Sequence, residues 1–217
     1  MNAYIRIALL LIIDLLSFKL AGFWFGIVAT CIVVYRILSI LGVLGSIIIY
    51  KDCFKDGISY TKDYIGPYYK QRQAFMEAVK LIETFKLKDF FIIAIYHDSP
   101  DIVEKSKLRS SIGIYRVNSM KNEAVPEDFE KFCEKNGYNK NELPKADSLY
   151  GHWDFSNFIA MIMGIIKFYK SLHQKGNYYK VDETKLKVCI EVYESDNYMS
   201  FYVPLEGEKF MIFKKDK

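Results

Sequence analysis

The apolar residues of this 217-residue chain are concentrated at its start. Residues 3 to 50 form a nearly continuous apolar block, whereas the rest of the chain mixes apolar and charged positions. The charged side chains of residues 1 to 50 are Arg6, Asp14, Lys19 and Arg36. Because a helix needs about 20 apolar residues to cross a bilayer, this pattern predicts a membrane anchor over residues 1 to 50.

The charges inside the block leave two arrangements of this anchor open. A single helix over residues 24 to 45 places Arg36 near the middle of the bilayer, at a cost of about 2.5 kcal/mol. Two shorter helices would instead form a hairpin, with Lys19 or Arg36 near its turn. We favour the single span. Basic residues accumulate on the cytosolic side of membranes, so the lysines that follow favour a cytosolic position for the remaining chain. These lysines are Lys51, Lys55 and Lys62.

Helical and strand patterns alternate after the apolar block. The spacing of apolar residues predicts helices over residues 68–85, 126–136 and 155–172. Runs rich in β-branched and aromatic residues predict strands over residues 58–64, 90–96, 109–116, 185–194 and 198–204. The polar stretches at residues 118–123 and 139–145 are interpreted as surface loops. The predicted fold class is therefore α+β.

Two parts of this region resemble each other. Ile93 to Tyr96 reads Ile-Ala-Ile-Tyr, and Ile190 to Tyr193 reads Ile-Glu-Val-Tyr. A long predicted helix precedes each of these strands, and a further strand follows each. We favour an internal duplication over a chance similarity of two amphipathic strands. The duplication predicts one pseudo-symmetric antiparallel sheet, with halves at about 58–117 and 150–205, inside a domain over 56–213.

Charge and cysteine content narrow the class of protein. The net charge of +4 is divided evenly between the first 50 residues and the rest, and no stripe of Lys and Arg stands out. We therefore expect no nucleic-acid partner. The cysteines lack the paired spacing of a zinc site, and no phosphate-binding or dinucleotide motif is present, so we expect no metal and no cofactor. Cys53, next to the apolar block, is either a site of S-acylation or an inert thiol.

Several short motifs occur in the order found in one known domain family. Gly66-Pro67-Tyr68, Ile95 to Pro100, Lys107 to Gly113 and Val203-Pro204-Leu205 resemble the gyrase-inhibitor-like small-molecule-binding domain, of SHS2 type. The resemblance covers residues 58 to 205 and implies an antiparallel sheet with packed helices. Together with an apolar anchor, it is similar to the testis-expressed protein 264 family of endoplasmic-reticulum receptors for selective autophagy.

The receptor resemblance implies partners and a location. In that family, a long tail after the domain carries an aromatic-x-x-aliphatic motif that binds the ubiquitin-like autophagy modifier as an added strand. The present sequence ends at Lys217 without such a tail. The only substitute motif that we single out is Tyr178 to Val181, with Tyr178 and Val181 as its anchor residues. The resemblance implies a domain on the cytosolic side of the endoplasmic-reticulum membrane, with membrane lipid as a partner.

The domain resemblance also implies a cleft for a lipophilic, often cationic, small molecule. A carboxylate among aromatic rings suits such a ligand, because ring faces attract a cation and the carboxylate neutralises it. Strand alternation puts Glu191 and Tyr193 on one face. The aromatic residues that we expect around them are Tyr68, Tyr96, Tyr150 and Trp153. The alternative is a solvated Glu191 beside an ordinary core, which a chain with 17 Tyr and 16 Phe readily provides.

Two functions follow from these patterns. The first is a membrane-anchored receptor or adaptor of the endoplasmic reticulum, and the alternative is a membrane-tethered binder or sensor of an amphipathic or cationic ligand. Some relatives of the domain are hydrolases that use such a carboxylate, and a desolvated Glu191 would serve as a base. No second catalytic group stands at a recognisable spacing, so we expect no enzyme.

Overall fold

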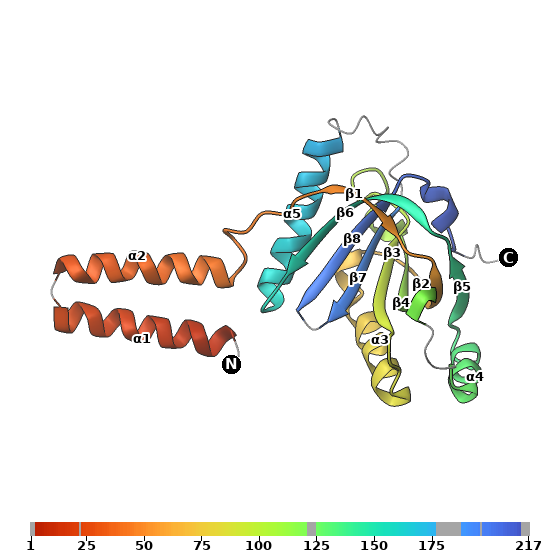
Figure 1. The fold of residues 1–217 in the computed structure, drawn as a ribbon, viewed down its shortest axis with the longest axis horizontal. Coiled ribbons are helices and arrows are strands. Elements are labelled where there is room, and N and C mark those ends of the chain that lie inside the picture. The colour runs from red at the N-terminus through yellow and green to blue at the C-terminus, as the bar shows by residue number, and fades with distance from the viewer. Residues whose placement is uncertain (1–2, 22, 121–124, 177–187, 196, 214–217) are drawn as a thin grey trace.

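The computed structural model of this chain describes residues 3–21, 23–120, 125–176, 188–195 and 197–213. In these residues, an antiparallel sheet curls into a half-barrel, and a helical hairpin projects from one side of it (Figure 1). The helices are α1 Ala3–Ala21, α2 Phe23–Ile40, α3 Arg72–Phe85, α4 Glu127–Lys135 and α5 Phe158–Gly176. The α+β class predicted from the sequence is confirmed.

The sheet is built from eight strands in the order β1-β6-β8-β7-β3-β4-β2-β5. Their bounds are β1 Tyr50–Phe54, β2 Gly57–Ile65, β3 Phe91–Tyr96, β4 Arg109–Val117, β5 Asn139–Leu143, β6 Ala146–Asp154, β7 Cys189–Ser195 and β8 Tyr198–Pro204. Each of the strand pairings is antiparallel. Short 3-10 turns at Tyr68–Lys70, Lys105–Lys107, Asn118–Met120 and Gly207–Phe210 connect or end these elements.

The two halves of the sheet repeat one order of elements. The first half runs β2, α3, β3, β4, and the second runs β6, α5, β7, β8. The halves meet at the β3–β7 pair, where Ala94 lies opposite Glu191. These are the two strands whose sequences resemble each other, so the predicted pseudo-symmetric arrangement is present in the structure.

Side chains on the two faces of the sheet form separate cores. Helices α3 and α5 cover one face, where Phe168 of α5 stacks on Phe201 of β8 with ring centroids 4.3 Å apart. The opposite face buries Ile93, Ile190 and Val192 under Phe54 and further apolar groups. Residues 189 to 193 therefore alternate between the two cores, as the predicted strand period requires. This alternation brings Glu191 to the helix-covered face.

The apolar block forms two helices, not one. Helices α1 and α2 lie side by side and antiparallel, and Thr30 Oγ1 donates a 2.9 Å hydrogen bond to Asp14 Oδ1 between them (Figure 1). The preferred interpretation of a single helix over residues 24 to 45 is wrong, because α1 ends at Ala21 and α2 runs over Phe23–Ile40. Within the described part of the chain, no helix combines the length and the apolar character needed to cross a bilayer.

Strands β1, β5 and β6 were missed or misinterpreted in the sequence, and no strand was predicted at β6. Residues 139–145 are not a surface loop, because Asn139–Leu143 forms the edge strand β5 beside β2. Its polar composition suits an edge, where one side of the strand faces solvent. Strand β1 begins at Tyr50, inside the stretch predicted as anchor, and pairs with β6. The strands predicted over residues 58–64, 90–96 and 109–116 are confirmed as β2, β3 and β4.

Candidate ligand-binding site

Glu191 lies at the centre of the helix-covered face. Its side chain is on β7, next to the line where the two halves of the sheet meet, and the residue is 2% exposed. The Tyr193 hydroxyl donates a hydrogen bond of 2.8 Å to Glu191 Oε2, and the Tyr96 hydroxyl donates one of 3.2 Å to the same atom. The sequence alternative of a solvated Glu191 is therefore wrong.

Aromatic rings from five elements surround this carboxylate. The ring of Tyr68 lies 4.6 Å from that of Tyr96, and the ring of Phe75 lies 5.4 Å from that of Tyr193. Tyr169 of α5 approaches Tyr96 and Cys189 from the other helix. Each of these rings is partly exposed, whereas Glu191 and Cys189 are buried. The result is a ring of aromatic surface around a buried acid.

Burial controls the charge state of the site. Loss of solvent raises the pKa of Glu191 from 4.5 to about 7, although the hydrogen bonds from Tyr193 and Tyr96 work in the opposite direction. Burial also raises the pKa values of Cys189, Tyr96 and Tyr169, so these groups are neutral at neutral pH. Glu191 is thus the group at this site whose charge changes near neutrality.

The Glu191 carboxylate has no basic partner among the residues that the structure describes. Its hydrogen bonds come from neutral phenols, and the described ion pairs join other residues. A buried carboxylate without a counter-charge is costly to ionise. A cation that binds among these aromatic side chains would supply the missing positive charge, and the faces of their rings would attract it as well.

The structure brings together four of the predicted ligand-binding residues. Tyr68, Tyr96, Glu191 and Tyr193 are contiguous. Tyr68 reaches its place from the turn after Pro67, and its hydroxyl lies 2.8 Å from the backbone oxygen of Asp98 and 3.1 Å from that of Arg109.

The other two predicted residues lie elsewhere. Trp153 is on the same face, but Met199 of β8 lies between it and Tyr193 in the strand register. Tyr150 belongs to the opposite face, where it contacts Tyr202 with ring centroids 4.9 Å apart. The prediction that Tyr150 lines the Glu191 cleft is therefore wrong, because strand β6 had not been placed and its alternation was unknown.

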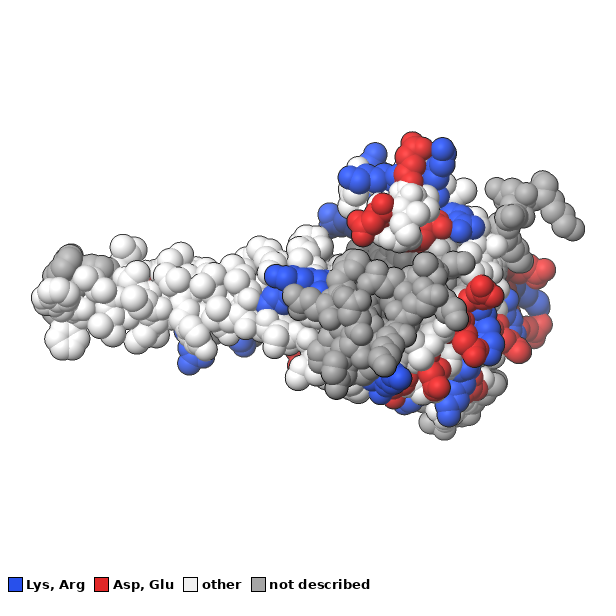
Figure 2. Space-filling view, turned by 90° about the horizontal axis from the view of Figure 1, so that it is seen from above, with Lys and Arg blue, Asp and Glu red and all other residues white. Residues whose placement is uncertain are grey.

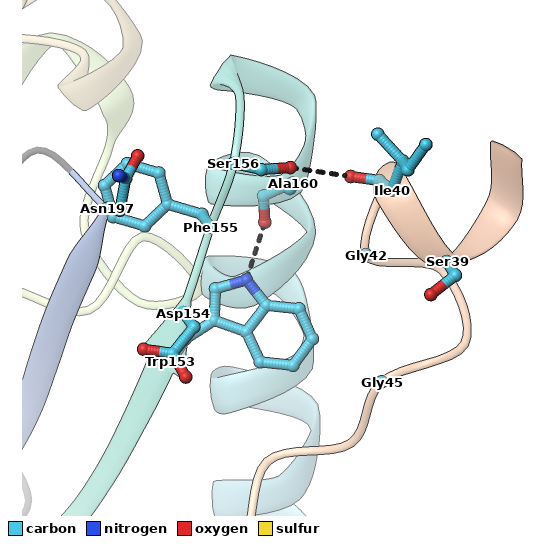
Figure 3. A pocket seen from close by; sticks show the side chains of 10 residues that line it. All are labelled: Ser39, Ile40, Gly42, Gly45, Trp153, Asp154, Phe155, Ser156, Ala160 and Asn197. Atoms are coloured by element: carbon cyan, nitrogen blue, oxygen red, sulfur yellow. Dashed lines mark hydrogen bonds between the residues drawn. The ribbon is translucent and has the colours of Figure 1, made fainter. Parts of the chain in front are cut away.

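Trp153 instead forms the junction between the hairpin and the domain (Figure 3). Its indole nitrogen donates a 2.8 Å hydrogen bond to the Ala160 carbonyl oxygen, and a cavity of about 450 Å³ lies beside it. Gly45 and Gly164 allow this ring to fit, because a Cβ on either residue would collide with it. Lys167 lies over the indole, with its ammonium nitrogen 5.2 Å from the ring centroid.

Polar groups of the domain hold the end of α2 at this junction. The Asn157 side-chain amide donates to the Ile40 carbonyl oxygen at 2.9 Å, as does the Ser156 hydroxyl at 3.2 Å. The Lys167 ammonium donates to the carbonyl oxygens of Gly42 and Val43, each at 2.7 Å, and to that of Gly45. Backbone carbonyls outside regular structure need a hydrogen-bond donor, and Lys167 supplies one to three linker carbonyls after α2, so it is well placed to fix the hairpin.

The sequence reasoning missed Phe75, Tyr169 and Lys167. Phe75 lies in the helix predicted over residues 68–85, and its apolar spacing did not show that this residue faces Tyr193. Tyr169 and Lys167 lie within the predicted helix 155–172. Tyr169 directly follows Phe168, and this position was the available signal that Tyr169 borders the core. No sequence feature indicates the partners of Lys167.

A serine, a histidine and a carboxylate also meet in the domain. Ser111 Oγ donates to Asp63 Oδ1 at 2.6 Å and lies 2.8 Å from His97 Nε2. Ser111 and His97 are buried, so a substrate has no access to the hydroxyl. We interpret this chain of contacts as structural. Among the described residues, no group of three or more His, Cys, Asp or Glu side chains is arranged to hold a metal ion.

Two predicted sites remain without a structural test. Tyr178 and Val181 lie outside the described residues. Cys53 is half-buried on β1, and its thiol donates to the backbone oxygen of Phe54 at 3.4 Å. S-acylation of Cys53 therefore stays a prediction.

No protein-family model and no curated protein matches this chain. Among solved structures, it is similar to an EcmrR–DNA complex in EcmrR-RPo, with a TM-score of 0.47 and 10% identity over 89% of this chain and 76% of that chain. SAV2435 bound to tetraphenylphosphonium gives 0.47 and 14% over 76% and 98%. An uncharacterized conserved protein from Listeria innocua gives 0.45 and 12% over 72% and 91%. At these identities, the similarity concerns the path of the chain and assigns no role to any residue.

Proposed function

We propose that the domain binds a lipophilic organic cation at Glu191. The observation that carries this proposal is a buried carboxylate that has no basic partner among the described residues and is ringed by partly exposed aromatic side chains. A lipophilic cation matches both features, since its apolar groups contact the rings and its charge replaces the missing counter-ion. The tyrosine hydroxyls hold the carboxylate in position.

Binding of this kind is linked to a proton. At neutral pH about half of the Glu191 side chains are protonated, because the pKa is about 7. A cation favours the ionised carboxylate, so its arrival expels the remaining proton. The groups that face Glu191 from the neighbouring elements are Tyr96, Tyr193, Tyr169 and Cys189, all neutral in this pH range. The proton therefore leaves from Glu191 itself.

The direct test is a calorimetric titration of the full chain with tetraphenylphosphonium. Triphenylphosphine oxide serves as a neutral aromatic control of related shape. We expect the cation to bind at least about tenfold more tightly than the neutral compound, and Glu191→Gln to remove this preference. Glu83→Gln is the matched control, because Glu83 is an exposed carboxylate on α3. Equal binding of both compounds, or an unchanged preference in Glu191→Gln, would overturn the proposal.

A second proposal concerns the helical hairpin, which we infer attaches the domain to a lipid surface. Large apolar side chains cover its outside: Leu15, Trp24 and Phe25 are 73%, 77% and 72% exposed. Figure 2 shows that charged side chains are dense on the domain and sparse along the hairpin on the visible face. Exposed apolar surface of this extent marks an interaction site, and membrane lipid is an occupant that requires no matching shape.

Flotation with liposomes tests lipid attachment. The full chain should float with phosphatidylcholine vesicles, whereas a variant with Trp24→Ser and Phe25→Ser should remain in the soluble fraction. Failure of the wild-type chain to float would contradict attachment, and this result would leave the Glu191 proposal unaffected.

We propose further that the lipid surface is the endoplasmic-reticulum membrane and that the chain acts there as a receptor for selective autophagy. The resemblance to the testis-expressed protein 264 family supports a location at the endoplasmic-reticulum membrane, with the domain in the cytosol. Titration with the ubiquitin-like autophagy modifier tests this function, and we expect Tyr178→Ala to abolish binding. Protease protection of the domain in sealed microsomes would contradict the cytosolic location. We propose no catalytic activity for this domain. Hydrolysis of a substrate by the wild-type chain that is lost in Glu191→Gln would contradict this expectation.

A further inference from the structure

A second aromatic cavity lies on the opposite face of the sheet from Glu191. It has a volume of about 220 Å³, and its wall includes Phe54, Tyr115, Tyr150 and Tyr202. Val192 lines this cavity, whereas its neighbour Glu191 points to the helix-covered face. Successive residues of a strand point to opposite faces, so the sheet itself separates the two sites.

The rings of this cavity contact one another at defined angles. Phe54 and Tyr202 meet edge to face, with centroids 5.2 Å apart, and Tyr150 lies 4.9 Å from Tyr202. Phe54, Tyr115 and Tyr150 are buried, whereas Tyr202 is half-buried, so Tyr202 is the ring of these four that offers surface to the cavity. The Tyr115 hydroxyl donates a 2.5 Å hydrogen bond to the Lys55 carbonyl oxygen, and this contact holds the chain between β1 and β2 over the rings.

Carboxylates stand at the rim of the cavity. Asp52 and Glu194 line it and are exposed, and Lys55 is the one basic side chain of the described lining. Glu194 Oε1 accepts a 2.5 Å hydrogen bond from Ser200 Oγ, which positions this carboxylate toward Tyr202. The charges of Glu194 and Asp52 reach the phenol of Tyr202, where both raise its pKa after the larger effect of burial. The rim therefore carries a net negative charge.

We propose that this cavity binds a small alkylated ammonium ion, such as a free trimethylammonium compound. Aromatic rings attract a cation through their faces, and alkyl groups on the nitrogen reduce the cost of removing it from water. The rim carboxylates add electrostatic attraction without burial of a charge. The volume is below the range of about 300–1,000 Å³ that drug-sized ligands occupy, so the ligand is smaller than the one proposed at Glu191.

The rim also determines the source of the trimethylammonium group. Free choline carries only the positive charge, whereas phosphocholine and phosphatidylcholine headgroups bring a phosphate close to it. That phosphate would lie near Glu194 and Asp52, and like charges repel. We therefore expect selection of the free cation over the headgroup.

The test is a titration of the full chain with choline, followed by NMR or calorimetry. The neutral isostere 3,3-dimethylbutan-1-ol has the shape of choline without its charge, so it measures the contribution of shape alone. Phosphocholine measures the effect of the phosphate that a lipid headgroup carries. We expect choline to bind at least about tenfold more tightly than the isostere. Weaker binding of phosphocholine than of choline is expected as well. Equal affinity for choline and the isostere, tighter binding of phosphocholine, or no binding of choline at about 10 mM would overturn the proposal.

Variants separate this site from the one at Glu191. Tyr202→Leu keeps apolar volume but removes the ring, and it should weaken choline binding by about tenfold. Tyr202→Phe keeps the ring and should retain binding, which also shows that the site survives substitution. Glu191→Gln should leave choline binding unchanged, so the two proposals fail independently. Loss of choline binding in Glu191→Gln, with retention in Tyr202→Leu, would move the cation to the other face and contradict this assignment.

Discussion

Tyr193 and Glu191 stand two residues apart on strand β7, and the hydroxyl of the first donates a 2.8 Å hydrogen bond to the carboxylate of the second. Tyr96 donates to the same oxygen from the neighbouring strand. Both donors are neutral, so they orient the carboxylate without cancelling its charge. A cation that binds beside Glu191 therefore meets a carboxylate whose negative charge is not neutralised.

The first prediction concerns stability against pH. Glu191 has a pKa of about 7 in the folded chain and an ordinary value of 4.5. Its folded pKa is raised, so its contribution to stability is fully present below about pH 4.5 and is lost as the pH rises through about 7. This loss amounts to about 3 kcal/mol. In urea unfolding across this range, the free energy of unfolding of the wild type should fall with rising pH relative to that of Glu191→Gln, because His97 and the other titrating groups act equally in both chains.

An exposed carboxylate provides the control. Glu83 lies on the outside of α3, and Glu83→Gln should keep the wild-type slope. A slope in Glu191→Gln equal to that of the wild type would contradict the altered pKa.

His97 is expected to act in the opposite direction. Burial and the nearby Arg109 lower the His97 pKa from 6.5 to about 4, against the smaller influence of Asp98. The stability that it contributes is present above about pH 6.5 and is lost as the pH falls through about 4. Imidazole resonances followed by NMR should show His97 titrating near pH 4. Titration close to pH 6.5 would contradict the buried neutral state.

Phe168 should be the most sensitive apolar residue of α5. It is fully buried and stacked on Phe201, so Phe168→Ala should lower the free energy of unfolding by about 3–5 kcal/mol. Phe158, at the start of the same helix, is 66% exposed. Phe158→Ala should change stability by less than about 0.5 kcal/mol, as measured by chemical denaturation. Equal effects of the two variants would show that α5 does not pack as described.

Lys167 is expected to control the hairpin rather than the domain. Lys167→Met removes the cation from the carbonyl oxygens after α2, so proteolytic cleavage in the linker of residues 41–49 should become about tenfold faster. The melting temperature of the domain should change little. The matched control is Lys170→Met, an exposed lysine one turn further along α5. Unchanged cleavage in Lys167→Met would show that other contacts hold the hairpin.

The central strands of the sheet could be predicted from the sequence because their signals are local. Strands β3 and β7 are apolar runs with β-branched residues, and alternation alone placed Glu191 beside Tyr193. The polar edge strand β5 has no such signal, since Leu143 is its one buried side chain and its partner β2 lies far away in the sequence. Without β6, the face of Tyr150 was undetermined.

The contacts made by Trp153 and Lys167 were beyond prediction for another reason. Both depend on the approach of α5 to the linker after α2, and these segments are separated by more than 100 residues. A glycine at 45 or 164 reads as a flexible position in the sequence, whereas the structure uses both for close packing against an indole. Such contacts follow from the three-dimensional arrangement and leave no periodic pattern.

The most direct test of the account is the number of protons released when a lipophilic cation binds. Calorimetric titrations with tetraphenylphosphonium at about pH 7, in two buffers that differ in ionisation enthalpy, measure this number. The Glu191 pKa of about 7 predicts release of about half a proton per cation, falling to zero in Glu191→Gln. It also predicts about tenfold tighter binding at about pH 8 than at about pH 6. Binding without proton release by the wild-type chain would contradict the claim that Glu191 is the partner of the cation.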